Sequence, residues 1–442
     1  MRRTVLLAAV ASISLWMAPL PGQATEVTTH VVDDDKAQCA EAGYTSIGAA
    51  VTAANPGDLI RVCAGSYPER VAVDKPVVIK GQPEAVEAID CFAPSASTRG
   101  DLDTTVLPVV SPPDATAEPL LRLAADGVEV SGLVFEGMVD PGVNSIYRAS
   151  LETSPLYSGY RVHHNLFRLN TLGMETASNG AIASRFDHNC LRENGWAIAN
   201  QRYPLGKARL DHNETFRQRN IAFEMGWVLA GVEDVRLDHN VSRLDGYGFF
   251  VEASSRVLIE DNVVQARLFN VAVNGGNRTV QISRNSILPG GTLGVFFRPL
   301  PQSGTTAPSE DVLVEGNTIH GMIGNPGSGI AVSPLHPVRD AHVRENVLSD
   351  NQGDGLRVNS GSGNTYSGNV MERNGGYGAT AGAGAAGNTF LGNVMLDNGT
   401  ADAHEAPAAV GVPQTELRND WIDNVCERDL PAGLICGMAE QP

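Results

Sequence analysis

An asparagine recurs about every 24 residues through most of the chain, each time in the same local setting. A large apolar residue lies three positions before each of these asparagines, and an apolar residue lies two positions after most of them. Self-similarity at a fixed period of this length indicates a solenoid, in which each repeat forms one coil. The recurrent asparagines are Asn165, Asn189, Asn213, Asn240, Asn262, Asn285, Asn317, Asn346, Asn369 and Asn393.

The apolar residues within each repeat alternate with polar ones, as in Val280-x-Ile282 and Val312-x-Val314, and this is the periodicity of a strand. The repeats are too short and too rich in Gly and Asn for a pair of helices. The sequence therefore predicts an all-β fold, a parallel β-helix whose coils stack roughly 4.8 Å apart. We expect the recurrent Asn at a bend, where it tolerates unusual backbone angles and its amide bonds to the Asn above and below.

The first 24 residues read as a signal peptide. Arg2 and Arg3 precede an apolar run from Val5 to Leu20, and Gly22-Gln23-Ala24 resembles a cleavage site. The mature protein should therefore be secreted or periplasmic. Removal of the signal peptide takes the net charge from −18 to −20. This acidic balance argues against nucleic acid and anionic membranes as partners. We expect a monomer with a polysaccharide partner. An anionic polysaccharide would require a local basic patch or Ca²⁺, and no other cofactor is expected.

Six cysteines in an exported chain indicate disulfides. Cys39 and Cys63 bracket the first structural unit, and Cys426 and Cys436 enclose a short loop near the end, so we expect these two pairs. Cys190 is either a buried free thiol or a partner of Cys91.

The chain divides into four parts. Residues 1–24 are the signal peptide, 25–125 an N-terminal cap with the first coils, 126–400 the β-helix repeats, and 401–442 a C-terminal cap. Thr45 or Ser46 can cap a short amphipathic helix that plugs the open end of the solenoid. Gly65-Ser66-Tyr67 reads as a turn, and residues 91–119 read as a long loop.

Two regions carry a family resemblance. The segments VDDDKAQC, TSIGAAVTAANPGDLIRVCAGSYPE and KPVVIKG, within residues 32–81, resemble the first turns of exported pectin-lyase-like β-helix proteins. Repeats such as VRLDHN and VLIEDN, within residues 128–400, resemble those of the NosD-like group in the carbohydrate-binding and sugar-hydrolase β-helix superfamily. The resemblance implies a right-handed β-helix and, for many members, polysaccharide substrates. It carries no catalytic residues over, since the NTD, DD, GHG and RIK set of polygalacturonases and the DPHE motif of mannuronan epimerases are missing.

One candidate row lies directly before the recurrent asparagines, where stacking would place four His in a column about 5 Å apart, beside a column of acids. This row could be a divalent-metal or proton-transfer strip, or a solvated turn in which Asp and His neutralise each other. We favour the turn, because metal sites gather ligands from several directions. The pairs are His163-His164, Asp187-His188, Asp211-His212, Asp238-His239 and Glu260-Asp261.

A second candidate row lies at the end of the strand that precedes each Asn-bearing strand. The middle residue of each triplet is expected to face outward, which would expose Ile198, Phe250 and Phe296. The aligned triplets are Ala197-Ile198-Ala199, Ile221-Ala222-Phe223, Phe249-Phe250-Val251, Val271-Ala272-Val273 and Val295-Phe296-Phe297.

Carboxylates, an arginine and aromatic rings along one groove suit a sugar chain. Glu224 and Glu252 are expected one coil apart, at about 5 Å, so that one of their pKa values rises. We therefore expect lyase or glycosidase chemistry at Glu224, Glu252 and Arg298. The expected substrate-binding residues are Glu175, Asn200, Arg202, Tyr203, Trp227 and Asn274.

The leading hypothesis is an exported protein that binds or processes an extracellular polysaccharide in a lateral groove of the β-helix. One alternative is a non-catalytic surface or carbohydrate-binding module, for which the second row is only a polar strand edge. The other is NosD-like assistance in metal-site maturation; NosD proteins assist copper-site maturation of nitrous oxide reductase.

Overall fold

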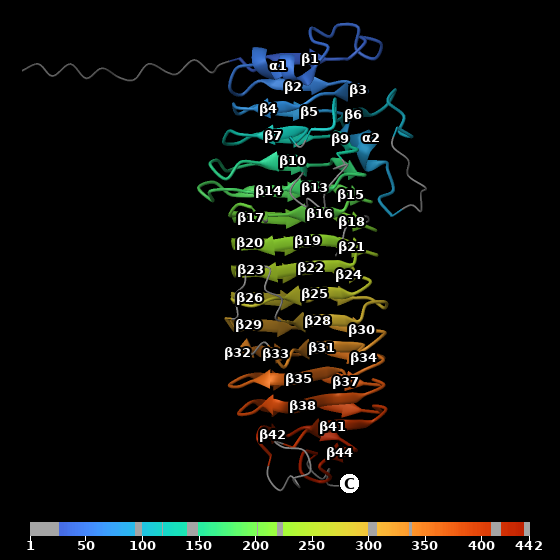
Figure 1. The fold of residues 1–442 in the computed structure, drawn as a ribbon, viewed down its shortest axis with the longest axis vertical. Coiled ribbons are helices and arrows are strands. Elements are labelled where there is room, and N and C mark those ends of the chain that lie inside the picture. The colour runs from blue at the N-terminus through green and yellow to red at the C-terminus, as the bar shows by residue number, and fades with distance from the viewer. Residues whose placement is uncertain are drawn as a thin grey trace, which may run out of the picture.

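The computed structural model describes residues 26–92, 100–116, 118–138, 149–200, 202–218, 224–298, 307–335, 338–407 and 417–436. Within these ranges the chain winds into one tall column of stacked coils, with the N-terminal helix at one end and the last strand at the other (Figure 1). The predicted signal peptide lies outside the described residues. In each regular coil the chain passes in turn through three parallel sheets, which we call sheets A, B and C.

Sheet A contains the strands that precede the recurrent asparagines. They are β1 (Thr29–Val32), β2 (Leu59–Val62), β5 (Val78–Lys80), β8 (Glu129–Ser131), β11 (Arg161–His163), β14 (Ser184–Asp187), β17 (Gly206–Asp211), β20 (Glu233–Asp238), β23 (Ser255–Glu260), β26 (Arg278–Ser283), β29 (Ser309–Glu315), β32 (Val338–Arg339), β33 (His342–Arg344), β36 (Thr365–Ser367), β39 (Thr389–Leu391) and β42 (Asp420–Ile422).

Sheet B contains the short strands that follow those asparagines. They are β3 (Gly65–Pro68), β6 (Pro108–Ser111), β9 (Val134–Glu136), β12 (Leu166–Arg168), β15 (Cys190–Arg192), β18 (Glu214–Phe216), β21 (Val241–Arg243), β24 (Val263–Gln265), β27 (Ser286–Ile287), β30 (Thr318–His320), β34 (Val347–Ser349), β37 (Val370–Glu372), β40 (Val394–Leu396) and β43 (Val425–Cys426).

Sheet C closes each coil. Its strands are β4 (Val71–Val73), β7 (Leu121–Leu123), β10 (Ala149–Thr153), β13 (Leu172–Glu175), β16 (Trp196–Ala199), β19 (Met225–Ala230), β22 (Tyr247–Glu252), β25 (Phe269–Val273), β28 (Leu293–Phe297), β31 (Ser328–Val332), β35 (Leu356–Gly361), β38 (Tyr377–Ala385), β41 (Ala401–Glu405) and β44 (Asp429–Leu430).

The predicted asparagine ladder is confirmed. Each recurrent Asn is buried, and its amide bonds to the equivalent Asn of the next coil, as between Asn213 Nδ2 and Asn240 Oδ1 at 3.1 Å. The ladder continues past Asn393 to Asn424. Because strands β17 and β20 on either side of this step also pair in register, one coil closes per recurrence.

The unusual backbone angles fall one residue earlier than predicted. The residue before the Asn, not the Asn itself, has a positive φ, as at His164 (54°), His212 (53°) and Asp261 (55°). Later coils place Gly316 or Gly368 there, with φ of 62° and 61°. The Asn side chain is thereby turned inward, where its amide satisfies buried backbone groups.

The two ends of the column differ in part from the prediction. Ser46 caps helix α1 (Ile47–Ala53), as predicted, and the helix packs its buried side chains on the first coils. Gly65-Ser66-Tyr67 is strand β3 rather than a turn. The predicted loop over residues 91–119 contains β6, and a second helix, α2 (Pro83–Glu87), precedes it. Beyond residue 400 the stacking continues through β41 to β44.

All six cysteines form disulfides. The two expected pairs, Cys39–Cys63 and Cys426–Cys436, are present, and Cys91 pairs with Cys190. Of the two alternatives for Cys190, the disulfide is therefore the correct one. It ties the segment after helix α2 to strand β15 of sheet B. No helix among the described residues has the length and apolar character needed to cross a bilayer.

Candidate functional site

An apolar cluster separate from the interior core lies on sheet C, and we call it the platform. Its buried members include Trp196, Met225, Tyr247 and Phe250, and Phe269 packs against it while partly exposed. The interior core takes other side chains of the same strands, such as Phe249 and Val251. Phe250 lies between Phe249 and Val251, and alternation along the strand sends its side chain to the opposite face, so the platform occupies the outer face of the coil.

Arg298 is the main polar group of the platform. Arg298 follows strand β28 and is only 8% exposed. Its Nη1 donates a hydrogen bond to the Tyr247 hydroxyl at 2.9 Å. Its Cζ lies 5.1 Å from the ring centroid of Phe269, 5.6 Å from that of Tyr247 and 6.0 Å from that of Phe296. The guanidinium is thus held on aromatic faces in cation–π geometry.

No carboxylate of the described residues lies within ion-pair distance of Arg298, and among these residues Tyr247 is its one side-chain hydrogen-bond acceptor. A guanidinium has five N–H donors. A largely buried charge is costly unless it is paired. In a chain with net charge −18, an arginine without a carboxylate partner in the described part of the chain favours an anionic ligand at this position.

Glu224 and Glu252 are not neighbours, so the predicted pair is wrong. Glu252 pairs in register with Ala230 at the end of the strands, whereas Glu224 precedes strand β19 at the other end. The interval from Asn213 to Asn240 is longer than the common repeat, and the strand therefore begins at Met225. The triplet used for the alignment, residues 221–223, lies outside the described residues.

Glu224 nevertheless borders the platform. Its carbonyl oxygen accepts hydrogen bonds from the backbone of Gly246 at 2.6 Å and of Tyr247 at 3.2 Å. Its carboxylate forms an ion pair with Arg267. Glu252 is only 1% exposed at the end of strand β22. The two carboxylates therefore occupy different environments at opposite ends of the sheet C strands.

Glu175, Arg202 and Tyr203 do come together, as predicted. Arg202 donates from Nη2 to Glu152 at 2.9 Å and from its backbone N–H to Glu175 at 3.1 Å, and its Cζ lies 5.6 Å from the Tyr203 ring centroid. Glu175 pairs in register with Glu152 and Ala199. Glu175 was expected to align with Asn200, but it aligns with Ala199, which is one residue earlier in the strand.

Four predicted substrate-binding residues are buried, namely Glu175, described above, and the three residues that follow. Trp227 belongs to the interior core, 5.5 Å from Phe249. The Asn200 amide bonds to the backbone of Ala230 in both directions, at 2.8 and 3.0 Å. Asn274 is fully buried. None of these three side chains lies on the outer surface.

A slip of one residue explains part of this error. Ile198 was predicted to face out, but it belongs to the interior core and pairs with Trp227, which pairs with Phe249. The outward column instead runs through Ala199, Val228, Phe250, Ala272 and Phe296. Because side chains alternate along a strand, a shift of one residue reverses every side-chain direction.

The predicted histidine column is confirmed. The rings of His164, His188, His212 and His239 stack with centroids 4.8, 4.8 and 5.0 Å apart and planes within 6° of parallel. The last three each bond through Nδ1 to the preceding Asp at 2.9 Å.

Arginines neutralise the buried acids of this column. Arg185 binds Asp211 with two hydrogen bonds of 2.9 and 2.7 Å, and Arg209 binds Asp238 in the same way. Burial raises the pKa of both carboxyls, but the hydrogen bonds from Arg and His outweigh it and the pKa values are lowered. The column is therefore internally neutralised, which supports its interpretation as a turn.

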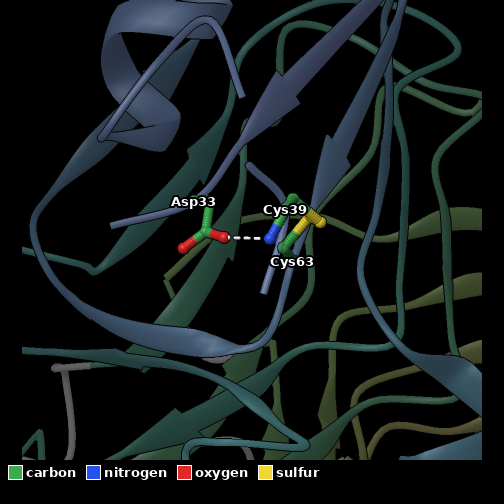
Figure 2. A group of neighbouring side chains, drawn as sticks. All are labelled: Asp33, Cys39 and Cys63. Atoms are coloured by element: carbon green, nitrogen blue, oxygen red, sulfur yellow. Dashed lines mark hydrogen bonds between the residues drawn. A yellow bond between two sulfur atoms is a disulfide. The ribbon is translucent and has the colours of Figure 1, made fainter. Parts of the chain in front are cut away.

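Sets of three or more close metal-ligating side chains occur, among the described residues, only around Asp33. For the set of Asp33, Cys39 and Cys63, Figure 2 shows that these groups are already engaged: Asp33 accepts a hydrogen bond from the Cys39 backbone, and Cys39 is bonded to Cys63. Asp33 also accepts from the N–H groups of Lys36 at 3.1 Å and Gln38 at 3.0 Å. Its carboxylate thus shapes the loop between β1 and α1.

An open cavity of about 490 Å³ lies on the outer face of sheet A, lined by Arg236, Arg256, Leu258 and neighbouring residues. Its two arginines are already paired, Arg236 with Glu260 at 2.9 Å and Arg256 with Asp234. The platform differs because no acid of the described residues pairs with Arg298. No local pattern in the sequence indicated the contact between Arg298 and Tyr247, which are 51 residues apart in the chain.

The family model described as "Right handed beta helix region" matches residues 226–395. No curated protein matches the chain. Among solved structures, the Dettilon tailspike protein gp208 has a TM-score of 0.52 at 12% identity, covering 82% of this chain and 63% of its own. The periplasmic alginate epimerase AlgG has a TM-score of 0.42 at 12% identity, covering 82% and 78%. A mannuronic acid specific polysaccharide family 6 lyase from human gut microbiota has a TM-score of 0.45 at 14% identity, covering 86% and 87%. Together with the three parallel sheets, the family match identifies the chain as a right-handed parallel β-helix protein.

Proposed function

We propose that the protein binds and processes an acidic extracellular polysaccharide along the outer face of sheet C. The observation that carries this proposal is Arg298, a largely buried arginine that rests on aromatic rings without a carboxylate partner among the described residues. An anionic group on the sugar, such as a carboxylate, would supply the missing partner through charge-assisted hydrogen bonds.

The shape of the site supports a polymer rather than a small compact ligand. Equivalent side chains of successive coils lie side by side along sheet C, from Val228 through Phe250 and Ala272 to Phe296. The partly exposed rings of Phe269 and Phe296 offer apolar faces for sugar rings. Val228, Phe250 and Ala272 are buried in this column, so a bound sugar chain would contact the partly exposed rings of Phe269 and Phe296.

The roles of the predicted residues follow from their positions. Arg298 would anchor the anionic group, and the Tyr247 hydroxyl would fix its orientation. Glu224 with Arg267 would contact the sugar at one edge of the platform, and Arg202 with Tyr203 would contact it further toward the N-terminus. Trp227, Asn200 and Asn274 would act by supporting the coils, since Trp227 packs in the interior core and the Asn200 amide bonds to the Ala230 backbone.

Export remains part of the proposal. Three disulfides in one chain are typical of proteins that fold in an oxidising compartment. Expression of the full chain in a bacterial host should yield protein in the periplasm or medium with an N-terminus near Thr25. An uncleaved N-terminus in the cytoplasm would contradict the predicted signal peptide.

Replacing Arg298 by Ala is expected to weaken oligosaccharide binding by about 10- to 100-fold, since a hydrogen bond to a charged group contributes about 1.5–3 kcal/mol. Tyr247→Phe should have a smaller effect because it keeps the ring. The measurement is calorimetric titration with alginate, pectate and neutral glucan oligomers, with and without a Ca²⁺ chelator. Arg278→Ala, an exposed arginine on sheet A, is the matched control.

Each outcome of this titration has a definite meaning. Binding of an anionic oligomer that depends on Arg298 and not on Arg278 would support the proposal. Equal binding by both variants, or preference for the neutral glucan, would refute the role of Arg298. Binding without any new reducing ends or unsaturated products would show that the protein is a non-catalytic carbohydrate-binding module.

A further inference from the structure

A group of ionisable side chains lies further along the same outward column of sheet C. In register, Phe296 of the platform pairs with Ala331, Ala331 with Arg357, Arg357 with Thr380, and Thr380 with His404. At roughly 4.8 Å per coil, His404 lies about 19 Å from Phe296. We call Asp354, Arg357, Tyr377, Thr380 and His404 the distal cluster.

The contacts within the distal cluster orient His404. The Thr380 hydroxyl lies 2.9 Å from Nδ1, and the Tyr377 ring stacks on the imidazole with centroids 4.5 Å apart and an interplanar angle of 15°. When Nδ1–H donates to Thr380, the lone pair of Nε2 is free to accept a proton. No partner of Nε2 occurs among the described residues, and the His404 side chain is partly exposed.

Asp354 lies on the other side of Tyr377. Its Oδ1 accepts the Tyr377 backbone N–H at 2.9 Å, and its Oδ2 lies 3.7 Å from Arg357 Nε. The residue is only 7% exposed. The Asp354 carboxylate therefore contacts the Tyr377 backbone and the His404 imidazole contacts the Tyr377 ring, on the face that we assign to the sugar chain.

Burial shifts the two groups in opposite directions. It raises the pKa of Asp354, although the Tyr377 backbone, Arg357 and His404 oppose the shift. It lowers the pKa of His404, although Asp354 and Glu405 oppose that shift. A carboxyl with a raised pKa beside an imidazole with a lowered pKa is the arrangement that general acid–base catalysis requires.

We propose that the distal cluster is the acid–base centre that hydrolyses a glycosidic bond of the bound polysaccharide. This inference rests on the proposed function. A water oxygen bonds to the anomeric carbon while the bond from that carbon to the glycosidic oxygen breaks. The water proton passes to His404 Nε2, and the Asp354 carboxyl gives its proton to the departing oxygen. Solvent then restores both groups, so protons and electrons balance.

The separation from the platform sets a minimum substrate length. A sugar chain must extend from Arg298 to His404 to use both sites, so only oligomers of several units should be cleaved efficiently. Arg357 and Tyr377 would position the chain at the scissile bond. Arg298 would contribute to binding and not to the chemical step.

The test compares turnover and binding in two conservative variants. His404→Gln and Asp354→Asn are expected to lower kcat by at least about 100-fold, since a general acid or base contributes about 10²- to 10⁴-fold. Their Kd for the oligosaccharide should stay within about twofold of that of the parent protein. His342→Gln, an exposed histidine on strand β33 of sheet A, is the matched control and should leave both quantities unchanged.

The pH profile gives a readout that a purely structural role would not move. Activity should depend on pH as a bell-shaped curve, because it needs His404 neutral and Asp354 protonated at the same time. His404→Gln should remove the acidic limb. Among the described residues, the other charged groups in this region include Arg357 on β35, Glu405 on β41 and Asp429 on β44, together with Arg418, which pairs with Glu405. Since they remain in the variant, a surviving acidic limb would point to one of them and overturn the assignment of His404.

The remaining outcomes separate this inference from the proposed function. Binding and cleavage that are unchanged in both variants would contradict the catalytic role of the distal cluster. They would not contradict the binding role of the platform. Unsaturated products would overturn hydrolysis, because no water is then added. Arg298-dependent binding without cleavage of any polymer would also overturn the acid–base centre alone, whereas failure to bind any polysaccharide would refute the proposed function itself.

Discussion

Replacing Asn240 by Leu is expected to lower the free energy of unfolding by about 4 kcal/mol. Asn240 is fully buried, and its Oδ1 accepts hydrogen bonds from the backbone of Asn213 at 2.9 Å and from its Nδ2 at 3.1 Å. Its own Nδ2 donates to the Leu210 carbonyl at 2.8 Å and to Asn262 at 3.0 Å. Leucine fills the same space without these bonds, and each buried polar group left unsatisfied costs about 1–3 kcal/mol.

Denaturant unfolding followed by circular dichroism measures this effect. Asn179→Leu is the matched control, because Asn179 is exposed in a loop and bonds only to nearby backbone groups. It should cost less than about 1 kcal/mol. Equal losses from the two substitutions would show that the ladder contributes nothing beyond ordinary asparagine contacts.

Asp245→Asn is expected to stabilise the protein at neutral pH by about 3 kcal/mol relative to its effect at pH 4. Asp245 is fully buried, and it accepts hydrogen bonds from Thr215 at 2.6 Å, Ser242 at 2.7 Å and the Gln218 backbone at 3.1 Å. Burial raises the pKa of its carboxyl to about 6, although these hydrogen bonds lower it. In the unfolded chain the ordinary value is about 3.9.

The sign follows from proton linkage. Between pH 4 and pH 6 the folded carboxyl keeps a proton that the unfolded one has lost, so stability falls as the pH rises. A difference of about two pKa units corresponds to about 3 kcal/mol. Asparagine does not titrate, so this loss is removed. The carboxyls with lowered pKa values, such as Asp211 and Asp238, act in the opposite direction. They are common to both proteins and cancel in the difference.

The experiment measures the free energy of unfolding of the parent and the variant from pH 4 to pH 8. Asp397→Asn, which makes the same change at an exposed position, is the control and should give a nearly constant difference. Parallel curves for the parent and Asp245→Asn would contradict a raised pKa at Asp245. A gap that widens with falling pH would give the opposite sign and would also contradict it.

Local patterns predicted the parts of the molecule that depend on neighbours in sequence. The Ser46 cap needs only the backbone three residues ahead, to whose N–H its side chain bonds at 3.3 Å. The histidine column needs only a coil of constant length, and the four histidines stack as expected. The sheet-C residues were harder to place, because the segments leading to them differ in length from coil to coil. The predicted alignment was wrong by one residue at Ile198, because Ala199 occupies that outward position. It was wrong by several residues at Glu224, because Ala230 is the residue that pairs with Glu252.

The amino-acid sequence alone determined that this chain coils once per asparagine repeat, because a repeated pattern of apolar and amide side chains can be satisfied only when equivalent positions stack. Only the tertiary structure decided which side chains of sheet C face outward and which polar groups share that face. Arg298 meets Tyr247, and His404 meets Tyr377 and Thr380, through pairings between coils. Such contacts depend on register and on loop lengths that local composition does not encode.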